Sequence, residues 1–210
     1  MEHIKSKFRQ GIGVDGLVTV NVLEPKSERD FEIIQEIRKN QAELKMIDVL
    51  SDIEKKHIYK KNKDLQDELE ASCLVRKVQQ HNIVTTAGLT QITKGLSTNL
   101  STLSELEINY AAVGTGTGAP AAGDTTLDTE SYRNVVNSLN YSSNILFASM
   151  FIDFTEDSGT YYEAGLFING TASADSGSLF DRVLLNSPTG ITKTTSQVLT
   201  VSFQITFTPV

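Results

Sequence analysis

The stretch LTVSFQITFT, residues 199–208, alternates apolar side chains with hydroxyl and amide side chains without exception. Successive side chains of a strand point to opposite faces, so this pattern predicts a β-strand with one buried face and one face in water. Residues 144–154 instead place apolar side chains on both faces, which predicts a central or interface strand. Five more stretches bring the expectation to about seven strands in an antiparallel β-sandwich, namely 74–78, 106–112, 132–139, 160–168 and 178–185.

The two halves of the chain differ in composition. Residues 82–210 contain 36 Ser and Thr, against 4 in residues 1–70. Residues 24–70 carry 10 Lys and Arg with 13 Asp and Glu. Charged residues favour helices and hydroxyl residues favour strands, so an α+β fold with a helical part followed by a β-domain is predicted.

Three segments are predicted. Residues 1–26 form an N-terminal arm in which Val18, Val20 and Val22 alternate with polar residues as in a strand. Residues 27–73 form a long charged helix, and residues 74–210 form the Ser- and Thr-rich β-sandwich with one short helix.

The predicted helix is long because no Gly or Pro occurs between Ser27 and Glu70. A helix of roughly 43 residues would span on the order of 65 Å. Its apolar positions follow an interrupted seven-residue pattern and are the predicted oligomer or docking residues: Ile33, Ile37, Leu44, Ile47, Ile58 and Leu65. One interpretation is a helix, bent near Asn62, that packs on its own domain. The favoured interpretation is a stalk that oligomerises, since so charged a helix buries little by itself.

Composition argues against several classes of function. A net charge of −7 and a pI near 5.0 disfavour binding to nucleic acid or to anionic membranes. The N-terminus lacks an apolar leader region and no run of 18 apolar residues is present, so neither a signal peptide nor a membrane span is predicted, and the lone cysteine is typical of synthesis in a reducing cytoplasm. The single cysteine, Cys73, and three scattered histidines predict no metal site and no catalytic site.

Residues 114–119, GTGTGA, satisfy the pattern of a dinucleotide-binding loop. That loop needs a following helix to hold the pyrophosphate, and here Pro120 and Gly123 follow. No cofactor is therefore predicted.

Two charged residues of the β-domain stand in apolar or tightly spaced surroundings, Arg133 and Glu163. They are either exposed strand residues or members of an ion pair. We favour a partly buried Glu163 paired with Arg133 or Arg182, because a buried carboxylate requires a partner.

A resemblance extends over roughly residues 75–207. It is carried by Asn82-Ile83-Val84-Thr85-x-x-Gly88, by Ala111-Ala112-Val113-Gly114-Thr115-Gly116-Thr117-x-x-Pro120-x-x-x-Asp124-x-x-Leu127-x-x-Glu130-x-x-Arg133, by Glu163-Ala164-Gly165-Leu166-Phe167, and by Leu179-Phe180-Asp181-Arg182 and Ile191-Thr192-Lys193. This series resembles a β-domain of tail, baseplate and fibre-attachment proteins of tailed bacteriophages. The resemblance implies a structural virion protein without catalytic residues, in which the Gly-Thr-Gly-Thr stretch is a structural loop.

The expected function is therefore a non-enzymatic subunit of the tail, baseplate or neck that docks neighbouring tail or fibre subunits. Its expected partners are further copies of itself, as a trimer or hexamer, and other virion proteins. The alternatives are a head decoration or head-fibre base protein and a receptor-binding module.

Overall fold

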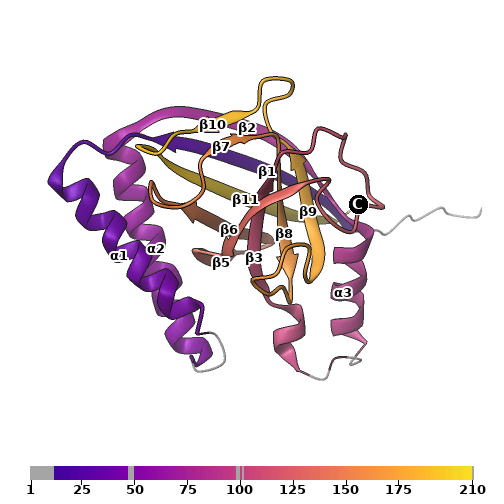
Figure 1. The fold of residues 1–210 in the computed structure, drawn as a ribbon. Helices are drawn as coiled ribbons and strands as arrows, with labels where there is room; N and C mark the ends of the chain where they lie inside the picture. Colours follow the sequence, from indigo (N-terminus) through magenta and orange to yellow (C-terminus); the bar gives the residue numbers. More distant parts are fainter. Residues whose placement is uncertain (1–11, 47–49, 98–99, 101, 210) are drawn as a thin grey trace, which may run out of the picture.

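The computed structural model describes residues 12–46, 50–97, 100 and 102–209. Figure 1 shows a curved sheet with two helices along one side and a third helix at the opposite end. In chain order the elements are β1 (Ile12–Leu23), α1 (Glu28–Leu44), α2 (Asp52–Cys73), β2 (Leu74–Val84), α3 (Thr86–Leu96), η1 (Leu103–Leu106), β3 (Ile108–Gly114), β4 (Glu130–Val135), β5 (Ser138–Ser142), β6 (Ile145–Ile152), β7 (Gly159–Tyr161), β8 (Glu163–Ile168), β9 (Ser178–Leu184), β10 (Ile191–Lys193) and β11 (Val198–Pro209).

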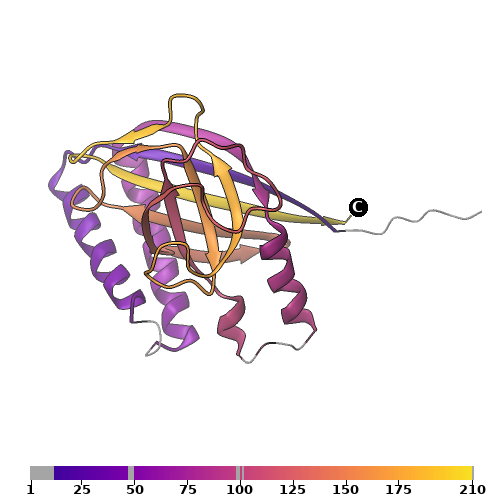
Figure 2. The same cartoon turned by 45° about the vertical axis from the view of Figure 1, so that its right-hand side comes forward.

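Nine strands form one antiparallel sheet in the order β4-β3-β8-β9-β2-β1-β11-β6-β5, and β7 and β10 form a small separate pair. Strands β1 and β11 form a long ladder inside the sheet, in which Val18 is opposite Phe203 and Val20 is opposite Val201. Figure 2 shows β1 and β11 continuing together toward the C-terminus. The N-terminal and C-terminal strands are thus neighbours inside the sheet.

The buried apolar face predicted for residues 199–208 is confirmed, but the predicted wet face is wrong. Thr200 is fully buried and donates to Glu70 of α2 at 2.9 Å, and Ser202 is half-buried beside Gln66, because α2 covers this side of the strand. Val201, Phe203 and Ile205 are almost fully buried in the main core, together with Val18 and Val20 of β1. The same core contains side chains of β3, β8 and β9, because the sheet curls and brings its two halves face to face. Curling lets a single sheet bury one face on itself.

The prediction of a β-sandwich is wrong, since the nine strands form one curled sheet. Strand β2 joins the two halves, because it pairs with β1 along most of its length and with β9 at Ile83 and Val84. A periodic pattern identifies strands and their buried faces but does not reveal a strand shared between two halves.

The predicted helical stalk over residues 27–73 is also wrong. Two helices occupy this region, and each begins with a capping box, Ser27 with Asp30 and Ser51 with Glu54. The second capping box, in the middle of the predicted helix, starts α2 anew and allows the chain to reverse. Helices α1 and α2 lie side by side and cover one side of the sheet (Figures 1 and 2).

The residues predicted to dock other subunits are used inside the chain. Five of them, Ile33, Ile37, Leu44, Ile58 and Leu65, are at most 8 % exposed. They pack against one another and against sheet residues such as Phe151 and Val198. The sixth, Ile47, lies outside the described residues. The weaker interpretation of the sequence, a helical segment packed on its own domain, therefore describes these five residues better than an oligomerising stalk.

The polar residues that interrupt the apolar pattern tie the helices to the sheet. Asn62 of α2 is fully buried, accepts a hydrogen bond from Asn40 of α1 at 2.7 Å and donates one to the Asn137 carbonyl at 2.9 Å. Gln66 accepts a bond from Ser149 at 3.0 Å. These side chains fix how the helices sit on the sheet, because a displaced helix would leave them buried without partners.

Candidate functional site

Glu163, at the start of β8, lies at the centre of a polar cluster that reaches from the protein interior to the loop between β3 and β4. Its side chain is fully buried. One carboxylate oxygen accepts the backbone N–H groups of Gly116 at 3.0 Å and Thr129 at 2.8 Å, and the other accepts that of Asp128 at 3.0 Å. These bonds hold both ends of the loop between β3 and β4 against the first residue of β8.

Arg182 of β9 neutralises Glu163 from the neighbouring strand. Its Nε donates to Glu163 at 3.0 Å, and its two terminal nitrogens reach Asp124 at 2.6 Å and Asp128 at 2.9 Å. Burial alone would lower the pKa of Arg182, but the bonds to Asp124 and Glu163 outweigh burial and raise it. Burial would likewise raise the pKa of Asp124, yet the Ala121 N–H and Arg182 hold that pKa below its usual value. The cluster is charged, compact and internally satisfied.

Of the two arginines considered for Glu163, the structure places Arg182 beside it and Arg133 elsewhere. Arg133 pairs with Glu130 three residues earlier, at 2.7 Å, with both side chains 3 % exposed. Its guanidinium also lies over the ring of Phe167, 4.1 Å from the centroid, and donates to the Ser176 carbonyl at 2.8 Å. Arg133 thus fixes a different loop, the one between β8 and β9.

The GTGTGA stretch is a loop whose shape is set by this cluster. A Cβ atom at Gly116 would come within 2.3 Å of the Glu163 carboxylate, so only glycine fits there. The Gly118 N–H donates to Asp128 at 2.8 Å. The backbone donors that would cradle a phosphate in a nucleotide site are bound here to the protein's own carboxylates, so the loop does not fit a dinucleotide.

Asp181, next to Arg182, is buried in a different setting. It is fully buried and bonded to Asn82 of β2, and its Oδ1 has no hydrogen-bond partner among the described residues. Burial raises the pKa of Asp181 well above its usual value. Asp181 belongs to the series that carries the resemblance, but its burial was not predicted from the sequence.

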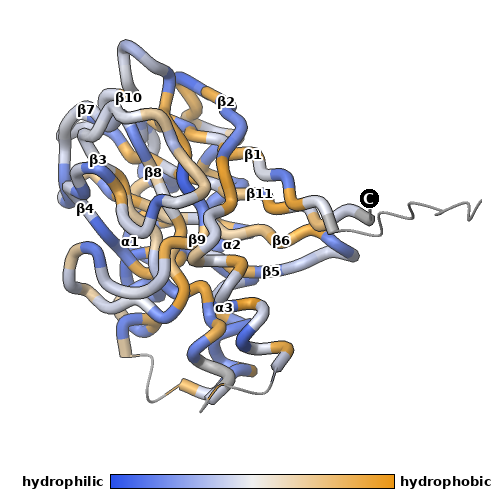
Figure 3. The backbone as a smooth tube through the Cα atoms, turned by 90° about the vertical axis from the view of Figure 1, so that its right-hand side faces the viewer, coloured by the Kyte–Doolittle hydropathy of each residue, from blue (hydrophilic) through white to orange (hydrophobic). Residues whose placement is uncertain are grey.

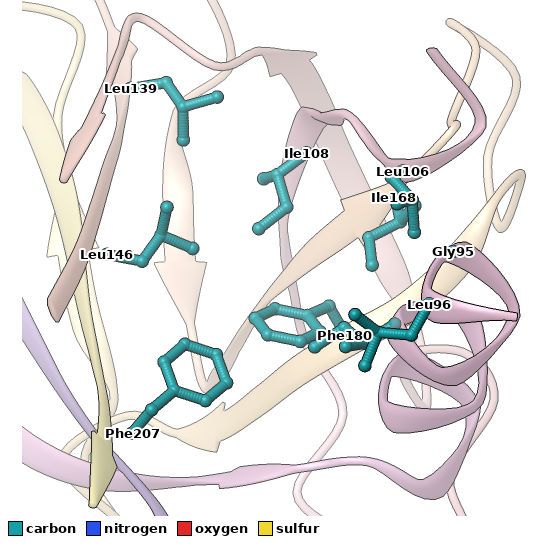
Figure 4. A pocket seen from close by; sticks show the side chains of 10 residues that line it. Gly95, Leu96, Leu106, Ile108, Leu139, Leu146, Ile168, Phe180 and Phe207 are labelled. Atoms are coloured by element: carbon teal, nitrogen blue, oxygen red, sulfur yellow. The ribbon is translucent and has the colours of Figure 1, made fainter. Parts of the chain in front are cut away.

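An apolar pocket of about 390 Å³ opens between α3 and the curled sheet. Figure 4 shows side chains of β5, β6 and β11 on one side and of α3, β8 and β9 on the other, all pointing into the space. Its lining consists of apolar residues and one glycine: Ile92, Gly95, Leu96, Leu106, Ile108, Leu139, Leu146, Ile168, Phe180 and Phe207. Leu96, at its rim, is 84 % exposed. The pocket offers contact surface but no acid, base or nucleophile.

Helix α3 is placed at this pocket by two residues of the sequence series described above. Thr85 caps the helix by accepting the Gly88 N–H at 3.1 Å. Gly88 packs so closely on Phe180 of β9 that a Cβ atom there would lie 2.7 Å from the Phe180 Cα. The apolar face of residues 85–96 was visible in the sequence, but the pocket was not, since it requires strands far away in the chain.

Within the described residues, no group of three or more His, Cys, Asp or Glu side chains is arranged to hold a metal ion. None of the described helices is both long and apolar enough to cross a membrane. Comparison with family models, with curated proteins and with solved structures finds no match to this chain.

Proposed function

We propose that this chain is a non-enzymatic structural subunit of a tailed-bacteriophage particle that assembles into the tail, baseplate or neck. The proposal is supported by where the residues that carry the resemblance to phage β-domains lie in the fold. Gly116, Asp124, Glu163 and Arg182 meet in one buried cluster, while Arg133 secures the adjoining loop. The series therefore consists of framework residues, which fits a structural module better than an enzyme.

The state of the carboxylates supports the same proposal. A catalytic acid or base needs an accessible oxygen in a cleft. Both oxygens of Glu163 are occupied by backbone N–H groups and by Arg182, and the largely apolar pocket beside α3 is lined by no carboxylate. The loop between β3 and β4 is held by charges within the chain, and Leu96 leaves an apolar rim exposed beside the pocket. Both features suit a protein whose surface contacts other proteins.

Location in the particle is the direct test. Purified particles of the phage that encodes the chain would be probed with antibodies raised against the recombinant protein, and the gold label would be located by electron microscopy. Label at the tail, baseplate or neck is the expected result, and label on the capsid would instead favour a head decoration or head-fibre base protein. Absence of the chain from particles, checked by mass spectrometry, would contradict the proposal.

Receptor binding is tested separately. Recombinant protein incubated with host envelope would remain in solution if its role is assembly, whereas saturable binding would favour a receptor-binding module. Hydrolysis of envelope material would contradict the non-enzymatic assignment.

A further inference from the structure

Strand β2 has one edge that no described strand covers. It pairs with β1 through residues 74–82, but it meets β9 only at Ile83 and Val84. Figure 3 shows β2, β1, β11, β6 and β5 one below another, with β2 at the top of the series. The outer edge of residues 74–82 therefore presents main-chain N–H and C=O groups at strand spacing. Alternate residues of an antiparallel strand direct these groups away from the paired neighbour.

The first four residues of this edge are open to solvent on both faces of the strand, whereas from Val78 onward one face is half-buried against the main core. Residues 74–77 are all exposed, and Leu74 and Val75 are 44 % and 47 % exposed although they are apolar. No proline interrupts residues 74–84, and the ladder from Arg76 to Asn82 is continuous with β1. An uncovered edge of this length is a template for another strand unless it is protected.

The charge of the edge restricts what can pair with it. Arg76 and Lys77 are adjacent, exposed, and form no ion pair with a described residue. Further along the strand, Nδ1 of His81 lies 3.7 Å from the carboxylate of Asp15, and both side chains are exposed. The free part of the edge is therefore cationic, within a chain whose net charge is −7.

We propose that residues 74–82 bind an extended acidic segment of a neighbouring protein, which adds to the sheet as a further antiparallel or parallel strand beside β2. Main-chain hydrogen bonds would supply affinity, and carboxylates of the segment would pair with Arg76 and Lys77. The identification of the donor as a virion subunit rests on the proposed function. The acidic strand itself follows from the edge and its charge.

A second copy of this chain fits the edge less well. Two antiparallel β2 strands paired about Val78 would place the Lys77 side chains of both copies on one face as diagonal neighbours, with Arg76 of each copy on the opposite face. Like charges in such positions destabilise a sheet. The cations that attract an acidic strand thus also discourage β2 from pairing with itself.

The test uses the whole chain and two fluorescent synthetic peptides of equal length, one alternating glutamate with valine and one alternating lysine with valine. Fluorescence anisotropy measures binding, and hydrogen exchange followed by mass spectrometry locates the amides that become protected. The charge-reversed variant is Arg76→Glu with Lys77→Glu. The matched control is Lys56→Glu with Lys60→Glu, which reverses two exposed charges on α2.

The expected result is binding of the glutamate peptide in preference to the lysine peptide, with new protection confined to residues 74–82. The variant at Arg76 and Lys77 should weaken glutamate-peptide binding about tenfold, because two attractive pairs become repulsive. The control variant should bind as the unmodified protein does.

Three results would overturn the proposal. These are equal binding of both peptides, protection that maps outside residues 74–82, and a concentration-dependent dimer that already protects these amides without peptide. The last result would assign the edge to a second copy. Because the peptides do not involve the particle, a failure here is distinct from failure to find the chain in virions.

Discussion

Replacing Glu163 by glutamine removes one charge from the buried cluster and preserves its volume. The amide oxygen of the new side chain can accept the N–H groups of Gly116 and Thr129. The amide nitrogen then faces two further donors, the Asp128 N–H and Arg182 Nε. Donors that face each other in a buried site lose their hydrogen bonds and regain none from water.

The size of the loss in stability depends on the ion pairs that Arg182 keeps after the substitution. Removing one member of a buried ion pair typically costs about 3 to 5 kcal/mol. Arg182 keeps Asp124 and Asp128 after the change, so the lower end of that range applies. A loss of about 3 kcal/mol in the free energy of unfolding corresponds to a melting temperature roughly 6 to 12 °C lower in a chain of this size.

Differential scanning calorimetry at neutral pH measures this change. The matched control is Glu32→Gln, which removes the charge of an exposed ion pair with Arg29 and should move the melting temperature by no more than about 2 °C. If Glu163→Gln and the control melted at the same temperature, the cluster would not stabilise the fold, and its role as a framework would be refuted.

Three further changes test other parts of the structure. Burial raises the pKa of Asp181, so the folded state loses stability as pH rises above the ordinary carboxyl pKa. Asp181→Asn should therefore raise the melting temperature at pH 7, and this gain should shrink as the pH is lowered toward about 4. Burial would raise the pKa of Asp30, but hydrogen bonds from Ser72 and from the start of α1 hold that pKa at about 2. The Asp30 carboxylate therefore stabilises the fold above the ordinary carboxyl pKa, and this stabilisation is lost as pH falls toward about 2. Asp30→Asn should lower the melting temperature at pH 7 and have little effect at the acidic limit. Gly88→Ala places a methyl group against the backbone of β9 and should lower the free energy of unfolding, measured by chemical denaturation, by about 2 kcal/mol. The control Gly123→Ala, whose methyl group meets no atom within 4 Å, should not lower it. Equal losses would show that α3 does not depend on close packing.

The helical region shows which features a local sequence pattern predicts and which it does not. The absence of Gly and Pro correctly indicated helix, but it also hid the reversal between α1 and α2. The capping box of Ser51 and Glu54 was a local signal for a new helix start. Asn40 and Asn62 look like faults in an apolar stripe, although they are buried partners of each other. A one-dimensional pattern cannot tell a polar residue in water from one whose partner lies on another element.

The candidate site, too, could be predicted from the sequence only in part. The sequence marked Glu163 as a carboxylate in apolar company and offered two arginines, but only the pairing of β8 with β9 brings Arg182 across from it. The open edge of β2 has no local sign, because an edge exists only where a neighbouring strand diverges.

Side-chain periodicity is a property of consecutive residues, and for that reason the sequence alone determined most strands, the apolar face of the C-terminal strand and the short helix α3. Closure of the sheet, the burial of the helical pair, the partners of each charge and the apolar pocket depend on contacts between residues far apart in the chain. Such contacts are selected by the packing of the whole core, and only the tertiary structure decided them.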